Sequence, residues 1–244
     1  MSNPSYVGLS LQVALQRKMD LIANNIANIN TTGFKAQRAI FVDYMMPSGS
    51  QAGSADQMAM PTDYGTYRDT ATGPIQITGN PLDVALSGEG YLTVQGPNGT
   101  LYTRGGNLAI SNDGTLTDQA GHPVLDESGS PIVVQQDDKE IAIAKDGVIS
   151  ARRGELAKIG IVKFANPNDL QPQGAGLYNT TDPALPDPDT SIQQGALEGS
   201  NVQPITEMSQ MIDVQRNYET VANLMQTQND DEKDMISKLS NVTA

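Results

Sequence analysis

The sequence of 244 residues contains no cysteine, no tryptophan and only one histidine. Without cysteine the chain has no disulfide bond, no thiolate metal site and no thiol nucleophile. The single histidine, His122, precedes Pro123 in a predicted turn, and the sequence lacks a second imidazole that could complete a zinc site. We therefore expect that the protein is not an enzyme, has no catalytic residue and holds no cofactor or metal ion.

Aromatic residues, basic residues and long apolar runs are also scarce. The 15 Lys and Arg residues are outnumbered by 28 Asp and Glu residues, so the formal net charge is −13. This charge repels phosphate backbones, which excludes nucleic acid as an expected partner. Residues 1–6 lack the basic start and the apolar core of a secretory signal, and no window has the length of a transmembrane helix. We expect neither a cleaved signal peptide nor membrane insertion.

Turn-forming residues are abundant in the middle of the chain. Short β-branched runs, such as residues 92–94, 132–134 and 159–162, alternate there with Gly, Asn and Asp. This pattern predicts an antiparallel β-rich outer domain over residues 80–165. Residues 43–79 have no period and are predicted to be an extended linker, and 166–197 a return connection with a loop rich in Pro and Asp.

Both ends of the sequence carry helical apolar stripes. From residue 7 to residue 29 apolar side chains recur at steps of four and three, and Gly33 is a plausible left-handed stop after this helix. A similar stripe follows Pro204, a residue typical of the first helical turn, and continues to the C-terminus. The sequence therefore predicts one long amphipathic helix at each end.

The two predicted helices have complementary charges. The segment up to residue 42 holds four basic residues against one acidic residue, whereas the segment from residue 205 onward holds seven acidic residues against three basic residues. Opposite charge and matching apolar stripes favour pairing of the helices, as an antiparallel coiled coil or across subunits. We therefore predict an α+β fold in which residues 1–42 and 198–244 form a discontinuous helical axial domain, paired as a coiled coil.

Uncharged amides in the first predicted helix are unusual, because Asn has a poor helix propensity. Beside an apolar stripe, amide side chains can fix the register of packed helices by hydrogen bonding. We therefore include three of them among the residues predicted to pack subunits together. The predicted packing residues are Leu11, Leu15, Met19, Ile22, Asn24, Asn25, Ile26, Asn28, Ile29, Met208, Met211, Ile212, Gln215, Tyr218, Ala222, Met225, Ile236 and Leu239.

Acidic residues offer the only hint of a ligand site. Asp187 and Asp189, with Asp182 nearby, could chelate calcium, but the order of oxygen ligands in an EF-hand is missing. The simpler interpretation is a solvated acidic loop. A turn-rich acidic β domain could also bind or cleave glycans of the envelope, although catalysis would need two carboxylates placed about 5 to 10 Å apart.

Five blocks of sequence carry a resemblance to a known family. They are residues 19–35 (MDLIANNIANINTTGFK), 79–85 (GNPLDVA), 88–91 (GEGY), 103–106 (TRGG) and 197–219 (LEGSNVQPITEMSQMIDVQRNYE). Together they resemble the bacterial flagellar rod and hook proteins over nearly the whole chain. The length and the short linker most resemble the proximal-rod type that adjoins the distal rod. Leu108 departs from the family pattern, which often has an aromatic residue there.

The resemblance implies a structural role. A member of this family would assemble with copies of itself and with other rod proteins into the periplasmic drive shaft of the flagellar basal body, which transmits torque for motility. The resemblance also implies export through the flagellar type III apparatus, without a cleaved signal peptide. Three alternatives remain: a distal-rod or hook-type axial subunit, an envelope glycan-binding or glycan-active β protein, and a soluble coiled-coil adaptor.

Overall fold

The computed structural model describes the backbone of residues 3–47, 57–135 and 141–242, and the side chains of residues 6–41, 65–135 and 141–238. The chain divides into two compact units. We call Met1–Ile26, Gln37–Tyr67 and Gln203–Ala244 the helical unit, and Ala27–Ala36 and Arg68–Val202 the β unit. The predicted α+β class, with a helix at each end of the chain and a β-rich middle, is confirmed.

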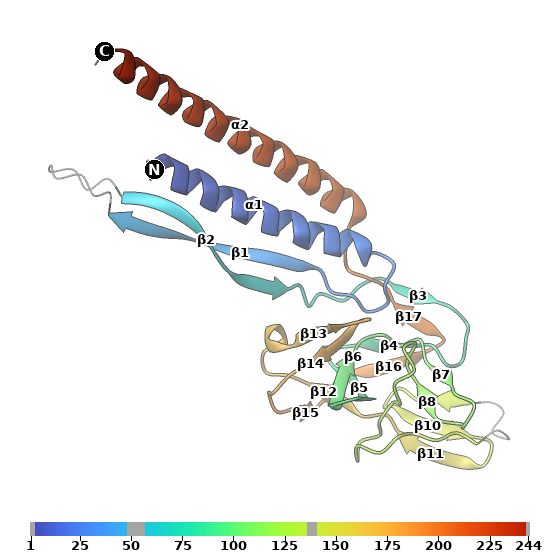
Figure 1. The fold of residues 1–244 in the computed structure, drawn as a ribbon. Helices are drawn as coiled ribbons and strands as arrows, with labels where there is room; N and C mark the ends of the chain where they lie inside the picture. The colour runs from blue at the N-terminus through green and yellow to red at the C-terminus, as the bar shows by residue number, and fades with distance from the viewer. Residues whose placement is uncertain (1–2, 48–56, 136–140, 243–244) are drawn as a thin grey trace. The chain divides into compact units, whose positions relative to one another are not determined.

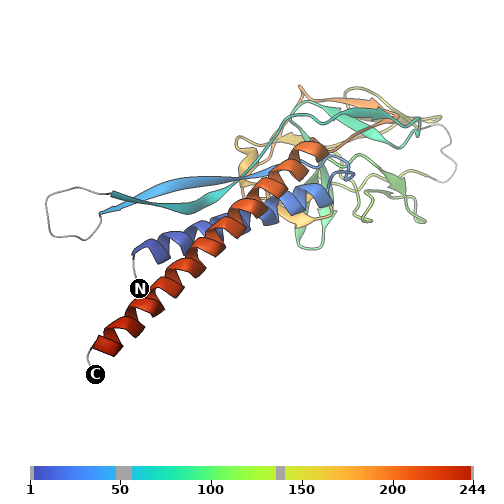
Figure 2. The same ribbon diagram turned by 90° about the horizontal axis from the view of Figure 1, so that it is seen from above.

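The helical unit contains two helices and a two-stranded ribbon. Helix α1 (Asn3–Ala27) and helix α2 (Pro204–Val242) lie side by side and run in opposite directions (Figures 1 and 2). Strands β1 (Gln37–Pro47) and β2 (Gln57–Arg68) pair with each other, and the ribbon runs alongside α1 (Figure 1). Pro204 opens α2, where a missing N–H costs no helical hydrogen bond.

The β unit consists of short strands. They are β3 (Ile75–Ile77), β4 (Val84–Ser87), β5 (Tyr91–Gly96), β6 (Gly99–Thr103), β7 (Ala109–Ile110), β8 (Leu116–Thr117), β9 (Ala142–Ile143), β10 (Val148–Ala151), β11 (Gly154–Lys158), β12 (Ile161–Lys163), β13 (Gln171–Gly174), β14 (Leu177–Asn179), β15 (Leu185–Pro186), β16 (Ser191–Gln194) and β17 (Ala196–Glu198), with a 3-10 turn at Pro167–Asp169. The largest sheet has the order β13-β14-β6-β5-β12-β15, and a second has the order β11-β10-β9. Pairs β16-β4, β17-β3 and β7-β8 complete the unit.

The two larger apolar clusters of the β unit form most of its core. The larger one includes Leu86, Leu92 and Ile149, which are each fully buried. The smaller one is aromatic, and the Tyr91 ring meets the Phe164 ring edge to face at 5.8 Å between centroids. Apolar burial and edge-to-face ring contacts of this kind supply most of the free energy that offsets the entropy lost on folding. The β unit therefore has a core of its own.

The structure differs from the prediction in both regions expected to be connections. Residues 43–79, predicted to be a linker, contribute to β1 and contain β2 and β3. Residues 166–197, predicted to be a return connection, contain β13 to β16 and most of β17. For β3, β16 and β17 the reason is non-local pairing: β16 pairs with β4 and β17 pairs with β3, each more than a hundred residues earlier in the chain. Such partners leave no local periodicity to detect.

Candidate subunit interface

The inner faces of α1 and α2 come into close contact near the start of α1. Gly8 of α1 lies against Met225 of α2, since a Cβ atom added to Gly8 would be only 3.0 Å from the Met225 Cγ atom. Further along, Leu21 and Ile22 of α1 and Val214 of α2 are buried. These residues form an apolar face on each helix that is covered within the chain.

Asn25 connects the elements of the helical unit by hydrogen bonds. Its side chain is buried, donates from Nδ2 to the Gln37 carbonyl oxygen at 2.9 Å, and accepts from the Gln37 N–H at 2.9 Å. Nδ2 also donates to Oε2 of Glu207, a buried residue of α2, at 3.2 Å. Arg38 approaches the other Glu207 oxygen at 3.8 Å. One amide thus connects α1, β1 and α2 and fixes their mutual register.

Each helix also has a second apolar face, which is exposed to solvent among the described residues. On α1 this outer stripe consists of Tyr6, Leu9 and Val13, whose exposed fractions are 52%, 52% and 61%. On α2 it consists of Ile205, Met208 and Ile212, with exposed fractions of 82%, 58% and 49%. The spacing of three and four residues places each set on one side of its helix. Contiguous exposed apolar side chains of this kind indicate an interaction site.

The residues predicted to pack subunits together fall into several environments. Ile22 and Asn25 are buried, and a larger group is half-buried within the helical unit: Leu11, Leu15, Met19, Ile26, Met211, Tyr218, Ala222 and Met225. The exposed group is Asn24, Met208, Ile212, Gln215 and Ile236. Asn28 and Ile29 are half-buried in the β unit, whereas the side chain of Leu239 lies outside the described residues.

Sequence reasoning missed four residues of the outer stripes. Tyr6, Leu9, Val13 and Ile205 were not among the predicted packing residues, although their spacing is helical. A single stripe per helix was expected, so the second stripe, on the opposite side of α1, was overlooked. Two apolar stripes on one amphipathic helix are the signal that would have found them.

In the β unit, three charged residues from three of the resembling blocks meet in the interior. Lys35, Arg104 and Glu198 are each 3% exposed or less. The Lys35 Nζ atom is 2.6 Å from Glu198 Oε1, and the Arg104 Nε atom is 3.0 Å from Glu198 Oε2. Burial lowers the pKa of the Lys35 amine, and the hydrogen bond to Glu198 opposes this shift. We call this set the charge network; its members were not predicted to be functional.

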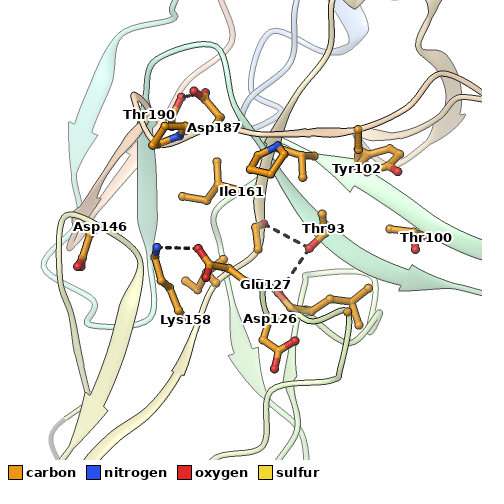
Figure 3. Close-up of a pocket in the computed structure, with 18 of the residues that line it drawn as sticks. Thr93, Thr100, Tyr102, Asp126, Glu127, Asp146, Lys158, Ile161, Asp187 and Thr190 are labelled. Atoms are coloured by element: carbon orange, nitrogen blue, oxygen red, sulfur yellow. Dashed lines mark hydrogen bonds and ion pairs between the residues drawn. The ribbon is translucent and has the colours of Figure 1, made fainter.

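A cleft of about 840 Å³ opens elsewhere in the β unit. Figure 3 shows its side chains: Ile161 lies between the Thr190–Asp187 pair on one side and the Lys158–Glu127 pair on the other. The Lys158 Nζ atom is 2.6 Å from Glu127 Oε1. These charged groups are therefore engaged with protein partners. Among the side chains that the structure describes, no group of three His, Asp or Glu residues is placed to hold a metal ion.

Asp187 was predicted to lie in a solvated acidic loop, but the structure buries it at the edge of this cleft. The Thr190 hydroxyl donates to Asp187 Oδ2 at 2.5 Å, and the Lys163 Nζ atom lies 3.3 Å from Oδ1. Burial by itself would raise the pKa of this carboxyl, but the hydrogen bonds from Thr190 and Lys163 outweigh it and hold the pKa below its ordinary value. The Asp187 carboxylate therefore stabilises its own loop through these contacts.

This pKa shift predicts a pH dependence of stability. Because the folded-state pKa of Asp187 is below its unfolded value, its stabilisation is present above about pH 4 and is lost as the pH falls through the folded pKa. Asp187→Asn should lower the melting temperature at neutral pH and leave a smaller difference from the wild type in acid. Thermal unfolding between about pH 3 and about pH 7 measures this. A constant difference across that range would contradict the role given to the carboxylate.

The exposed apolar stripes of α1 and α2 indicate an interaction site on the helical unit. No described helix is long and apolar enough to cross a membrane.

Comparison with known protein families identifies the class of protein to which this chain belongs. Residues 6–35 match the family described as flagella basal body rod protein, residues 85–151 the D1 domain of the flagellar hook protein FlgE/F/G, and residues 193–239 the C-terminal part of flagellar basal body rod FlgEFG proteins.

Individual relatives give the same result over almost the whole chain. The flagellar basal-body rod protein FlgF of Caulobacter vibrioides is 39% identical over 228 residues, which cover 92% of this chain and 93% of the relative. FlgG of Bacillus subtilis is 35% identical, with 91% and 93% covered, and FlgF of Salmonella typhimurium is 35% identical, with 90% and 91% covered. The chain belongs to the family of flagellar basal-body rod proteins, which confirms the prediction made from the resemblance.

Proposed function

We propose that this protein is a structural subunit of the proximal rod and that it assembles through the outer stripes of α1 and α2. The observation that carries the proposal is the pair of exposed apolar stripes, Tyr6, Leu9 and Val13 on one helix and Ile205, Met208 and Ile212 on the other. In a monomer two such apolar faces would stay exposed to water, whereas a neighbouring subunit would bury them. Because the chain belongs to the family of rod proteins, the proposed assembly is the flagellar rod.

The two faces of each helix would divide the work. The inner faces, with Gly8 against Met225, pair α1 and α2 within one subunit in the manner of an antiparallel coiled coil. The outer stripes would pack against different helices of neighbouring subunits, which is a heterologous contact. Heterologous contacts that do not close into a ring generate a helical tube. Many such contacts along the rod would transmit torque from the motor.

The partners and the location follow from the family. Copies of this chain and other rod proteins would supply the neighbouring subunits, and the rod would lie in the periplasm. Delivery there would require export through the flagellar type III apparatus. The relatives include both FlgF and FlgG proteins. FlgF of Caulobacter vibrioides is 39% identical to this chain, and FlgG of Bacillus subtilis is 35% identical. This supports a proximal-rod subunit next to the distal rod.

A glycan-active role has less support. Four acidic residues line the cleft of the β unit, and each one is engaged with the protein: Glu127 with Lys158, Asp187 with Thr190 and Lys163, Asp126 with Ser128 and Ser130, and Asp146 with the Val148 N–H. Glycoside hydrolysis needs two carboxyl groups that are free to act on the substrate. The rod assignment accounts for the apolar stripes, which a glycan-binding protein would not need.

Gene deletion followed by electron microscopy of isolated basal bodies tests the proposal. Basal bodies from the deletion strain should lack the complete rod and the filament, and the intact gene should restore both. A gene that lacks residues 1–30 should not restore them, because α1 and its outer stripe would be missing. Complete rods in the deletion strain would contradict a structural role.

A further inference from the structure

The segments that lead to the two terminal helices meet within the β unit. We call residues 31–36, which follow α1, the N-terminal stem, and residues 198–202, which precede α2, the C-terminal stem. The Gly33 N–H donates to the Glu198 carbonyl oxygen at 2.8 Å, and the Asn201 N–H donates to the Phe34 carbonyl oxygen at 3.2 Å. Phe34 and Val202 are buried in one small apolar cluster. The stems are thus docked to each other by backbone and side-chain contacts.

Asn201 adds a third segment to this joint. Its Oδ1 atom accepts from the Ala36 N–H at 2.7 Å, and its Nδ2 atom donates to the carbonyl oxygens of Asp69 and Ala71 at 2.9 and 3.0 Å. The Lys35 Nζ atom also donates to the Ala71 carbonyl oxygen, at 2.8 Å. The polar groups of Asn201 and Lys35 therefore need partners that are distant in the sequence, so we expect the joint to form as a whole.

Electrostatics makes Glu198 the member on which the others depend. Lys35 and Arg104 are both buried; burial lowers the pKa of the Lys35 amine, and the charge of Arg104 lowers it further. Glu198 lies between them, and its Oε1 atom also accepts from the Gly73 N–H at 3.0 Å. Without this carboxylate, two buried like charges would face each other with no carboxylate between them. The N-terminal stem carries the cation Lys35, and the buried carboxylate that forms an ion pair with it, Glu198, lies in the C-terminal stem.

We propose that Glu198 is a positioning residue that makes the ordering of the N-terminal stem conditional on the C-terminal stem. Neither stem would then be ordered until both stems are present and docked to each other. During assembly, the N-terminal stem would stay unordered until the segment that holds Glu198 is available to it. The relevance to assembly rests on the proposed rod function, but the coupling itself is a property of the isolated subunit.

Amide hydrogen exchange on the full-length isolated protein tests the coupling. In Glu198→Gln, peptides that cover residues 31–36 and residues 199–202 should both exchange about 100-fold faster or more, because a broken buried pair leaves uncompensated charge. Peptides from β5 and β6 should keep their protection. Loss of protection in only one stem would overturn the proposal, and so would an equal loss in β5 and β6, which a merely structural role predicts.

A second substitution separates the electrostatic cause from general damage. Lys35→Met alone leaves a balanced Arg104–Glu198 pair, so it should speed exchange of the stems less than about tenfold. In the Glu198→Gln background the same change removes the unneutralised second cation, so it should slow exchange again. Equal effects of Lys35→Met in both backgrounds would overturn the proposal. Glu198→Gln alone could fail to fold. In that case, a folded double variant with Lys35→Met would support the proposal, and an unfolded double variant would overturn it.

These measurements are independent of rod assembly. If the stems prove uncoupled, the deletion experiment on basal bodies can still establish the rod function. If the deletion strain builds complete rods, coupled stems would remain a property of the fold. The two failures are therefore distinguishable.

Discussion

Replacement of Val13 by aspartate should abolish incorporation of the subunit into the rod while leaving the isolated protein folded. Val13 is 61% exposed in the outer stripe of α1, so a charged side chain there remains solvated in the free subunit and costs little stability. In the assembled rod the same carboxylate would be buried in an apolar contact without a partner, which costs several kcal/mol per contact. Such a loss lowers the affinity of each subunit contact by about 100-fold or more.

Swimming motility and the rod content of isolated basal bodies measure this effect. Ile212→Asp in the outer stripe of α2 should have the same result, because both stripes are proposed to face neighbouring subunits. Val13→Ile is the matched control: it changes the same position but keeps it apolar, so rods should form. Circular dichroism and thermal unfolding of the purified variants should match the wild type. Normal motility of Val13→Asp would refute the assignment of the outer stripe.

The inner face predicts a different outcome for the same chemical change. Ile22 is 4% exposed within the helical unit, so Ile22→Asp would place a charge inside the subunit itself. Loss of function there would follow from a damaged subunit and would say nothing about contacts between subunits. The contrast between Val13 and Ile22 is therefore the informative comparison, and sequence periodicity alone does not provide it.

The terminal helices were the part of the fold that the sequence predicted well. Their apolar side chains recur at helical spacing, and the signal is local, since it needs only neighbours three and four residues away. The predicted first helix, residues 7–29, corresponds to α1 at Asn3–Ala27, and Gly33 does adopt a left-handed conformation with φ of 67°. The spacing could not show which of two apolar faces is covered within the chain.

The charge network could not be predicted, for a physical reason. Glu198 binds Lys35 and Arg104, which are 163 and 94 residues away from it in the chain. A charged residue in a sequence is usually a solvated surface residue, and nothing in its own neighbourhood shows that it is buried. The three residues do lie within the blocks that resemble the rod family, so the resemblance marked the right segments without showing that they meet. The pairing of β16 with β4 and of β17 with β3 was missed for the same reason.

Gly106→Ala should strongly destabilise the β unit, because the backbone of β4 leaves no space for a side chain at this position. A Cβ atom on Gly106 would lie 1.7 Å from the Val84 carbonyl oxygen and 2.8 Å from the Val84 carbonyl carbon. Val84 is buried in the larger apolar cluster, and its N–H donates to the Gly106 carbonyl oxygen at 2.8 Å. The clash can be relieved only by moving β4, which breaks this hydrogen bond and disturbs the core. We expect a loss of about 3 kcal/mol, at the upper end of overpacking effects.

The adjacent glycine is the control for this substitution. A Cβ atom on Gly105 would lie 3.3 Å from the Thr103 hydroxyl oxygen, which belongs to a side chain that can shift, and has no closer neighbour. Gly105→Ala should therefore change stability by less than about 1 kcal/mol. Thermal unfolding of the two variants should show a loss of about 10 °C for Gly106→Ala and a change of a few degrees for Gly105→Ala. Equal melting temperatures would contradict the close approach of residues 84 and 106. A large difference would show that the second glycine of the TRGG block is required by the contact with β4, because a loss of flexibility alone would affect both glycines alike.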